Sequence, residues 1–291
     1  MKKCVSLLLA GIVGLVMGIG LARDEGEIQV AGRIGPELET ILSEDGHRVT
    51  LDHGISRIQG GRTALGDSLS VALERELLRS KAHRENIESY HVTGYKKKIL
   101  IVSPQSGPYL QEVHTQGSLE KTDNPFHLAI EGPGFFRVSR PDGQIVYTRA
   151  GDFHFDGPTQ SIKTAQNCSL GVEIPSGYCN VTVSLQGEVR GLSYGSGEPD
   201  LLGQLELAAF DHPENLIALG GGLYQEHPDA GPKRRGRPGD GARGLGVIAQ
   251  GHLERSNVDF DYQTAELAQS ERRADFLHRC LTSVRPGIVT Y

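Results

Sequence analysis

A serine in a Gly-x-Ser-x-Gly pattern comes nearest in this sequence to a catalytic nucleophile by residue type and spacing. Residues 191–195 read Gly-Leu-Ser-Tyr-Gly. In hydrolases this pattern holds the serine on a sharp turn between a strand and a helix. No helical pattern follows here, because residues 195–199 read Gly-Ser-Gly-Glu-Pro and would interrupt a helix. The sequence therefore favours a plain loop over a serine hydrolase, and predicts no catalytic residue.

Two neighbouring segments have the composition of ligand-binding loops. Residues 239–244 fit Gly-x-Gly-x-x-Gly but lack the preceding strand and the βαβ unit that would aim a helix N-terminus at a phosphate. Residues 233–238 contain an Arg-Gly-Arg-Pro core like that of minor-groove hooks. The run is brief and the chain has a formal net charge of -6, so a solvated loop is favoured over a nucleic-acid contact.

Metal and cofactor chemistry finds no support in the spacing of the candidate ligands. The 11 histidines show no His-x-x-x-His pattern, and the cysteines show no Cys-x-x-Cys pattern. Asp259 and Asp261 are predicted to begin a helix through favourable charge and capping, in preference to acting as paired catalytic acids. We expect no metal, no cofactor and no small-molecule substrate.

Two of the four cysteines, Cys168 and Cys179, lie close together in a turn-rich region. A disulfide between them would suit a chain exported to an oxidising space. Two unpaired thiols are the alternative.

The elements that position these residues are mainly short strands. The chain has 291 residues, a hydrophobic fraction of 37%, 38 glycines and 14 prolines, which is enough for one or two cores and indicates many turns. Residues 117–138 predict a strand, a turn and a strand, because Phe126, Leu128 and Ile130 alternate and Gly132-Pro133-Gly134 separates them from Phe135 and Phe136. We expect a β-hairpin there.

Two helical patterns flank the strands. Leu65, Leu69, Leu73, Leu77, Lys81, Arg84 and Ile87 mark one face of a helix that starts near Asp67 and reaches about Ser89. Leu267, Ser270, Ala274, Leu277, Leu281 and Val284 form a seam on a second helix. Because each helix has one apolar stripe, we expect them to pair, with Leu73 and Leu77 facing Leu277 and Leu281.

The N-terminal residues have the form of a secretory signal. Met1-Lys2-Lys3 precedes an apolar run from Val5 to Leu21, and Gly20-Leu21-Ala22 supplies small residues for cleavage before Arg23. The run is also near the lower limit for a membrane span, so an uncleaved anchor in the inner membrane remains open. Residues 23–61 predict a short helix and strand, or an extended linker.

The strand–turn–strand segment closely resembles the signature of bacterial flagellar rod and hook basal-body proteins, especially the distal-rod type. That signature is Gly-x-Leu-x-x-Thr-x-x-Pro-x-x-x-Ala-Ile-x-Gly-x-Gly-Phe-Phe, and the matching residues are Gly117, Leu119, Thr122, Pro125, Ala129, Ile130, Gly132, Gly134, Phe135 and Phe136. Thr122-Asp123-Asn124-Pro125 predicts a turn, because Asp and Asn side chains bond to nearby backbone and the residue before a proline is kept out of the helical region.

Three further segments carry the same resemblance. Residues 86–96 are similar to the family's helix-end motif through Asn86, Ile87, Gly94, Tyr95 and Lys96, with Ser89 and Val92 where the family has Asn and Thr. Tyr147-Thr148-Arg149 continues to Gly151 and Phe153 as the family does. Residues 250–259 follow Gln-Gly-Tyr-Leu-Glu-x-Ser-Asn-Val-Asp through Gly251, Ser256, Asn257 and Val258, among others.

The resemblance implies a β-rich domain inserted between paired terminal helices, in a structural component of the bacterial flagellar basal body. We expect a signal or anchor (1–22), an extra segment (23–61), a rod-like helix and its end motif (62–98), a β-rich domain (99–246), and a C-terminal motif with a helix (247–291). The family assembles with copies of itself and with other rod, hook or ring subunits. A membrane-anchored or secreted envelope module that does not polymerise is the alternative.

The matched residues are accordingly expected to serve assembly or structure. These are Asn86, Gly94, Tyr95, Thr122, Asn124, Pro125, Gly132, Gly134, Phe135, Phe136, Gly251, Ser256, Asn257 and Val258.

Overall fold

The computed structural model describes residues 62–284 and, in the N-terminal part, the strand residues 5–8, 17–20, 27–31, 48–52 and 55–59. The chain divides into two compact units. The first comprises Met1–Lys81 and Ala265–Tyr291, and the second comprises Ala82–Thr264. The second unit is therefore inserted into the sequence of the first.

The first unit contains a five-stranded antiparallel sheet. Its strands lie in the order β1 (Val5–Leu8), β2 (Met17–Gly20), β3 (Glu27–Ala31), β5 (Ile55–Gln59) and β4 (Arg48–Asp52). Three of these strands, β3, β4 and β5, lie within residues 23–61, where we expected either a short helix and strand or an extended linker. The question of signal cleavage lies outside the described residues. Among the residues described, no helix is long and apolar enough to cross a membrane.

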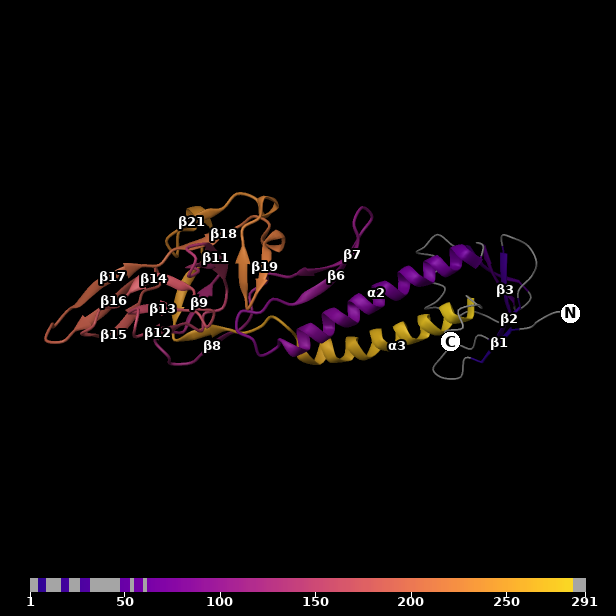
Figure 1. Ribbon diagram of the computed structural model, residues 1–291, viewed down its shortest axis with the longest axis horizontal. Coiled ribbons are helices and arrows are strands. Elements are labelled where there is room, and N and C mark those ends of the chain that lie inside the picture. The colour runs from indigo at the N-terminus through magenta and orange to yellow at the C-terminus, as the bar shows by residue number, and fades with distance from the viewer. Residues whose placement is uncertain are drawn as a thin grey trace. The chain divides into compact units, whose positions relative to one another are not determined.

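Two long helices run side by side and antiparallel, as predicted (Figure 1). They are α2 (Arg62–Glu88) and α3 (Phe260–Val284). Within the first unit the Ser80 hydroxyl donates to Ser270 Oγ at 2.9 Å, and both serines are buried. The fold class, mainly β with two flanking helices that pack together, is confirmed.

The predicted seam of α3 is correct at three central positions, whereas that of α2 is correct at Leu69 and wrong at Leu77. Ser270, Ala274 and Leu277 are buried. On α2, however, Leu77 is 56% exposed and Leu73 is only partly buried. Besides Leu69, the buried positions described on α2 are Ala72, Glu76, Ser80, Ala82 and Asn86. Small and polar side chains allow the two helices to approach closely and to form hydrogen bonds, so the buried face of α2 is not its leucine-rich one.

The second unit consists mainly of antiparallel strands. Its largest sheet has nine strands in the order β12 (His154–Asp156), β13 (Ser161–Lys163), β14 (Ser169–Glu173), β10 (Phe135–Ser139), β11 (Ile145–Thr148), β20 (Leu223–Gln225) and β19 (Ile217–Gly220), with β18 (Leu207–Ala209) joining β10 to β21 (Arg234–Gly236). A three-stranded sheet contains β15 (Tyr178–Val183), β16 (Glu188–Ser193) and β17 (Pro199–Gln204). Three two-stranded sheets pair β6 (Lys98–Ser103) with β7 (Gly107–Glu112), β8 (Leu119–Lys121) with β23 (His252–Glu254), and β9 (Leu128–Glu131) with β22 (Val247–Gln250). Three short 3-10 helices, at Pro213–Asn215, Pro228–Ala230 and Gly241–Arg243, lie in its loops.

The two predicted strands of residues 117–138 exist as β9 and β10, but the expected hairpin is wrong. β9 pairs with β22, and β10 pairs with β11, β14 and β18. Gly132 and Gly134 both adopt positive φ, at 101° and 129°, so the chain turns away between the two strands. A strand–turn–strand pattern thus predicted the elements but not their partners.

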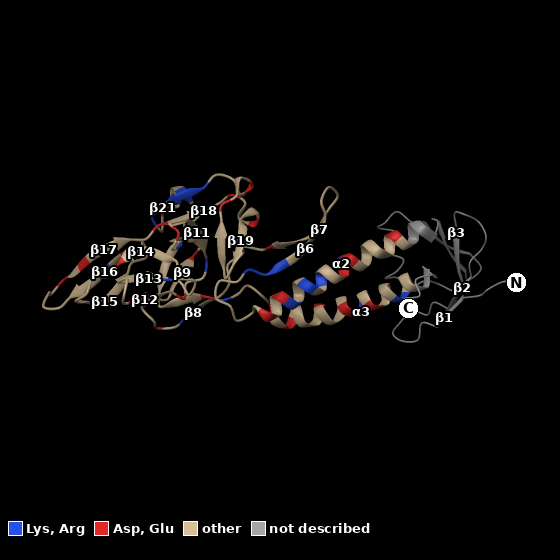
Figure 2. Cartoon of the chain, in the orientation of Figure 1, with Lys and Arg blue, Asp and Glu red and all other residues tan. Residues whose placement is uncertain are grey.

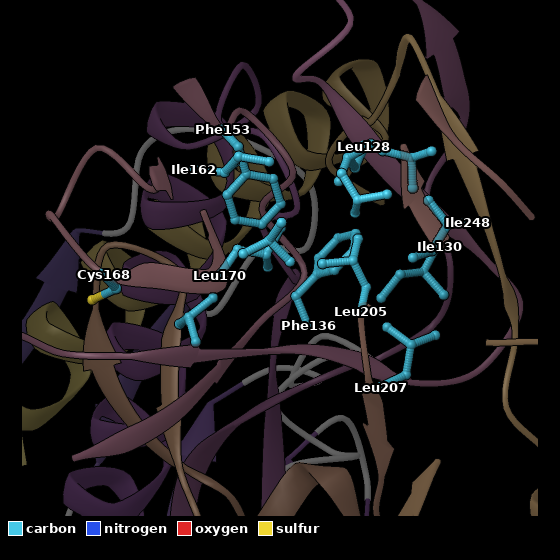
Figure 3. Packing of buried hydrophobic residues seen from close by; sticks show 14 of the residues in the cluster. Leu128, Ile130, Phe136, Phe153, Ile162, Cys168, Leu170, Leu205, Leu207 and Ile248 are labelled. Atoms are coloured by element: carbon cyan, nitrogen blue, oxygen red, sulfur yellow. The ribbon is translucent and has the colours of Figure 1, made fainter. Parts of the chain in front are cut away.

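The two phenylalanines at the start of β10 pack on opposite faces of the sheet, as the period of two residues requires. Phe136 is fully buried in the main core, where its ring makes an edge contact with Phe153 at 5.1 Å between centroids (Figure 3). Phe135 joins a second cluster on the other face and contacts Phe210 at 6.0 Å. Both predicted motif residues therefore serve the core.

Candidate functional site

The motif segments, which are far apart in the sequence, meet in the second unit around one buried carboxylate, that of Glu254. Strand β23 carries Glu254 and pairs with β8 in a register that places Glu254 opposite Leu119. The Glu254 carbonyl accepts the amide of Gly94 at 2.8 Å, which draws in the helix-end motif. Arg149, which directly follows β11, reaches the same point, so all four motif segments converge.

Glu254 binds two cations and a backbone amide although its side chain is completely buried. Its Oε1 accepts from Lys96 Nζ at 2.5 Å and from the amide of Gly117 at 2.9 Å. Its Oε2 accepts from Arg149 Nε at 2.8 Å and lies 2.6 Å from Arg149 Nη2. Such short, charge-assisted hydrogen bonds offset the cost of burying the three charges.

Burial lowers the pKa of both Lys96 and Arg149, and the nearby Glu254 carboxylate acts in the opposite direction. The side chains of Lys96 and Arg149 are 1% and 5% exposed. We name Lys96, Arg149 and Glu254 the ion cluster. It holds two cationic side chains and one carboxylate.

Arg149 also organises the turn between β9 and β10. Its Nη1 donates to the carbonyl oxygens of Gly132 and Gly134 at 3.0 and 2.6 Å, and its Nη2 donates to that of Ile130 at 3.2 Å. The planar fork of the guanidinium suits this divergent set of acceptors, which a lysine could not reach together. These bonds hold the turn in the form that separates the two strands.

A second polar cluster surrounds Asn86, a predicted motif residue that is fully buried at the end of α2. Its amide nitrogen donates to the carbonyl of Lys98 at 2.8 Å and to Gln263 Oε1 at 3.1 Å. Its Oδ1 accepts from the amide of Lys98 at 2.8 Å and from the Tyr95 hydroxyl at 3.1 Å. Burial raises the pKa of Tyr95 to about 12, so this hydroxyl keeps its proton at neutral pH. Asn86 therefore joins the end of α2, the start of β6 and the start of α3.

Asn257 and Ser256 hold the segment between β23 and α3. The Oδ1 of Asn257 accepts the amide of Lys97 at 2.7 Å, and its Nδ2 donates to the carbonyls of Val113 and Thr115 at 2.7 and 3.1 Å. The Ser256 hydroxyl accepts the amide of Val258 at 3.2 Å, and Val258 is buried. Asp259 Oδ1 accepts the amide of Tyr262 at 3.0 Å, so this aspartate caps the helix, as predicted.

The predicted turn of residues 122–125 lies at the other end of β8. Asn124 Oδ1 accepts the amide of Phe126 at 3.0 Å, and Thr122 Oγ1 lies 2.9 Å from Nδ1 of His127. The carbonyl of Pro125 accepts from the side chain of Gln250 at 2.9 Å, and that of Gly251 accepts the Thr122 amide at 2.7 Å. The two motifs are thus joined at this end as well.

The structure brings most of the predicted site residues into one connected region, but sequence reasoning did not select its centre. Lys96, Arg149, Glu254 and Gly117 were included only as matches within motifs. The available signal was that Lys96, Arg149 and Glu254 carry complementary charges in three different motif segments, although each segment also contains another charged residue, such as Glu88, Asp152 or Arg255. Without a fold, that signal gave no reason to place them together.

Cys168 and Cys179 are free thiols in the structure, which corresponds to the unpaired alternative. Cys168 is buried in the main core, whereas the thiol of Cys179 lies 3.3 Å from the carbonyl of Leu192 within the three-stranded sheet. Their surroundings on different sheets explain why closeness in the sequence was a poor guide to pairing.

The Gly-x-Ser-x-Gly segment and the glycine-rich loop lie at a strand end and in a 3-10 turn. Ser193 ends β16 and is followed by strand β17. The glycine loop forms a 3-10 turn in which Asp240 accepts the amides of Ala242 and Arg243. Among the described residues no group of His, Cys, Asp or Glu could hold a metal ion.

The basic run coincides with β21 (Figure 2) and is largely neutralised. Each of its first three side chains pairs with a nearby acid: Lys233 with Glu226 at 2.6 Å, Arg234 with Asp211 at 3.1 Å, and Arg235 with Glu206 at 2.6 Å. Residues 234–236 form a strand paired with β18, so the expected loop is wrong at these positions.

Comparison with known proteins identifies the class of the β region first. Residues 129–191 match the D1 domain of the flagellar hook protein FlgE/F/G family. The chain is also 37% identical over 163 residues to the flagellar basal-body rod protein FlgG of Buchnera aphidicola from Acyrthosiphon pisum, and 33% identical over 166 residues to that of Borreliella burgdorferi.

These two matches cover 56% of this chain and 62% of each relative's length. A third relative, the FlgG of Buchnera aphidicola from Baizongia pistaciae, is 28% identical over 243 residues, which cover 79% of this chain and 92% of that protein. The resemblance to the flagellar rod proteins is therefore confirmed, and the chain is similar in sequence to proteins named FlgG.

Proposed function

We propose that this chain is a structural subunit of the bacterial flagellar basal body, of the rod or hook type, and not an enzyme. The observation that carries the proposal is the convergence of the family motifs on the ion cluster. Each motif supplies one member of a single buried network, which ties the helix-end segment to the β strands. The similarity to rod proteins called FlgG agrees with this role.

The proposed partners are copies of this chain and other rod, hook or ring subunits. A rod requires heterologous contacts that repeat without closing. Among the described residues, α2 leaves Val71 and Leu77 exposed, at 38% and 56%, on the faces turned away from α3. These residues are suited to contacts between subunits.

The location in the basal body is proposed together with export through the cell envelope. The basic start and apolar run of residues 1–22 support a secretory signal with cleavage before Arg23, or a retained inner-membrane anchor. Mass spectrometry of the purified protein distinguishes the two forms, because an intact Met1–Leu21 segment would favour the anchor.

The second candidate is a membrane-anchored or secreted envelope module that retains the fold but does not polymerise. The strands β3, β4 and β5 favour it, because they build a sheet from residues 23–61, which precede the rod-like helix. A tagged copy separates the candidates by location. Recovery in isolated basal bodies supports the rod subunit, whereas recovery only in membranes that lack flagella contradicts it and supports the envelope module.

A further inference from the structure

A cleft of about 270 Å³ lies in the second unit beside the ion cluster. Its charged and polar lining residues are Lys96, His114, Gln116, Arg149 and Arg234, and its remaining lining consists of glycine, proline, alanine and phenylalanine. Three cationic side chains therefore line the cleft, and no acidic side chain does. Such a lining attracts an anion.

The three cations that line the cleft are paired directly with two acids, Glu254 and Asp211. Lys96 and Arg149 share the single carboxylate of Glu254. Arg234 has Asp211 as its partner, at 3.1 Å. Glu112 also acts on Lys96 and lies beside His114, but only the cations line the cleft, and their effect there is stronger than in water because the surroundings are less polar.

Two lining residues also contain buried polar atoms that lack a hydrogen-bond partner. Within the described part of the chain these are Nδ1 of His114 and Nε of Arg234. The His114 side chain is only 7% exposed, and its other ring nitrogen lies 3.9 Å from the Glu112 carboxylate. Glu112 accepts the hydroxyl of Tyr224 at 2.8 Å and does not line the cleft. Because buried polar groups rarely lack partners, the cleft has the character of an unfilled polar site.

We propose that the cleft receives the carboxylate of an aspartate or glutamate side chain from a second copy of this chain. The proposal rests on the proposed rod function. The volume lies below the roughly 300–1,000 Å³ typical of small-molecule sites and suits a single side chain. The chain carries 36 acidic against 30 basic residues, so a second copy offers carboxylates to a cationic cleft. A carboxylate would form charge-assisted hydrogen bonds with the arginines.

Carboxylate binding is tested by NMR titration of the full chain with N-acetyl-glutamate amide, observing the arginine Nε–H signals. The expected result is saturable shifts at Arg149 and Arg234, with none from the neutral N-acetyl-glutamine amide. Arg234→Gln should weaken binding at least tenfold. The matched control Arg235→Gln, whose residue pairs with Glu206 and does not line the cleft, should leave binding unchanged.

Unsaturable shifts, or equal shifts with the neutral amide, would overturn the proposal. If Arg234→Gln does not fold by circular dichroism, Arg234→Lys retains the charge but not the fork, and should still weaken binding relative to Arg235→Gln. Unchanged binding by a folded Arg234 variant would also contradict the proposal.

The source of the carboxylate is tested in cells, by counting tagged subunits in isolated basal bodies. A loss of Arg234→Gln subunits, with Arg235→Gln retained, supports a neighbouring copy as the source. Normal assembly of Arg234→Gln, together with saturable binding of the probe, would mean that the cleft takes a free small carboxylate and would overturn the second-copy occupant. Absence of the wild-type chain from basal bodies would refute the rod function and the second-copy occupant, while leaving carboxylate binding by the cleft intact.

Discussion

Replacing Glu254 by glutamine tests whether the ion cluster holds the second unit together. The substitution keeps the size of the side chain but removes the only carboxylate of the cluster, so the buried Lys96 and Arg149 lose their counter-charge. Removing one partner of a buried ion pair typically costs about 3–5 kcal/mol. For a unit of this size that corresponds to a decrease of roughly 6–20 °C in the unfolding temperature.

The assay is urea unfolding of the full chain, followed by circular dichroism and by tyrosine fluorescence, since the chain has 9 tyrosines and no tryptophan. The matched control is Glu120→Gln. Glu120 pairs with Arg255 between β8 and β23, and the two side chains are 50% and 40% exposed. Exposed pairs contribute at most about 1 kcal/mol, so this variant should be almost as stable as the wild type.

Removing one of the two cations of the ion cluster, in place of its carboxylate, supplies a stricter test. Lys96→Met removes one of the two cations and leaves Glu254 paired with Arg149. The carbonyl of Thr115 loses its hydrogen bond from Lys96 but keeps the one from Asn257. It should therefore destabilise the protein less than Glu254→Gln. The reasoning would be wrong if Glu254→Gln cost no more than Glu120→Gln, or less than Lys96→Met.

Three further predictions concern packing, conformation and pH. Gly94→Ala should destabilise the protein more than Gly107→Ala in the same urea assay. Both glycines have positive φ, which strains an alanine by about 1–2 kcal/mol. Only at Gly94 would the new Cβ also lie 2.6 Å from a backbone nitrogen, which adds about 1–3 kcal/mol. Equal losses would contradict this. Leu277→Ala should cost about 2–5 kcal/mol because Leu277 is fully buried, whereas Leu77→Ala should cost little because Leu77 is 56% exposed; the reverse order would restore the leucine-rich face of α2 as the buried one. Burial lowers the pKa of His114 from 6.5 to about 4, so between these pH values the folded state binds fewer protons than the unfolded state. The contribution of this neutral histidine to the stability of the fold, on the order of 3 kcal/mol, is complete above pH 6.5 and is lost as the pH falls towards 4. His114→Gln should flatten the fall in stability over this pH range, and an unchanged slope would count against a neutral, buried histidine.

The regular elements could be predicted from the sequence because their patterns are local. The α3 seam followed from the spacing of Ser270, Ala274 and Leu277, all of which are buried. The buried face of α2 could not be predicted in this way, because the leucines of α2 lie on more than one side of the helix. Apart from Leu69, its buried residues are small or polar. Which stripe is buried depends on the partner helix, and periodicity alone does not contain that information.

The partners of the strands were also beyond local reasoning. Gly132-Pro133-Gly134 has the composition of a hairpin turn, yet the bonds from Arg149 to the carbonyls of Gly132 and Gly134 direct β9 and β10 to different sheets. Those bonds come from Arg149, which follows β11 and whose guanidinium is also paired with Glu254 of β23. The same dependence on distant segments concealed the ion cluster.

The positions of the matched motif residues limit what the resemblance says about assembly. Asn86, Phe136 and Glu254 are buried and bonded or packed within the chain, so a match at these positions indicates the fold and not the partner. Contacts with other subunits must be made by exposed residues, and few of the matched motif residues, such as Pro125, are exposed. On the three-stranded sheet and its loops, Tyr194 and Leu201 are 81% and 57% exposed. Two relatives with the same motifs can therefore share the ion cluster and still differ in the subunits that they bind.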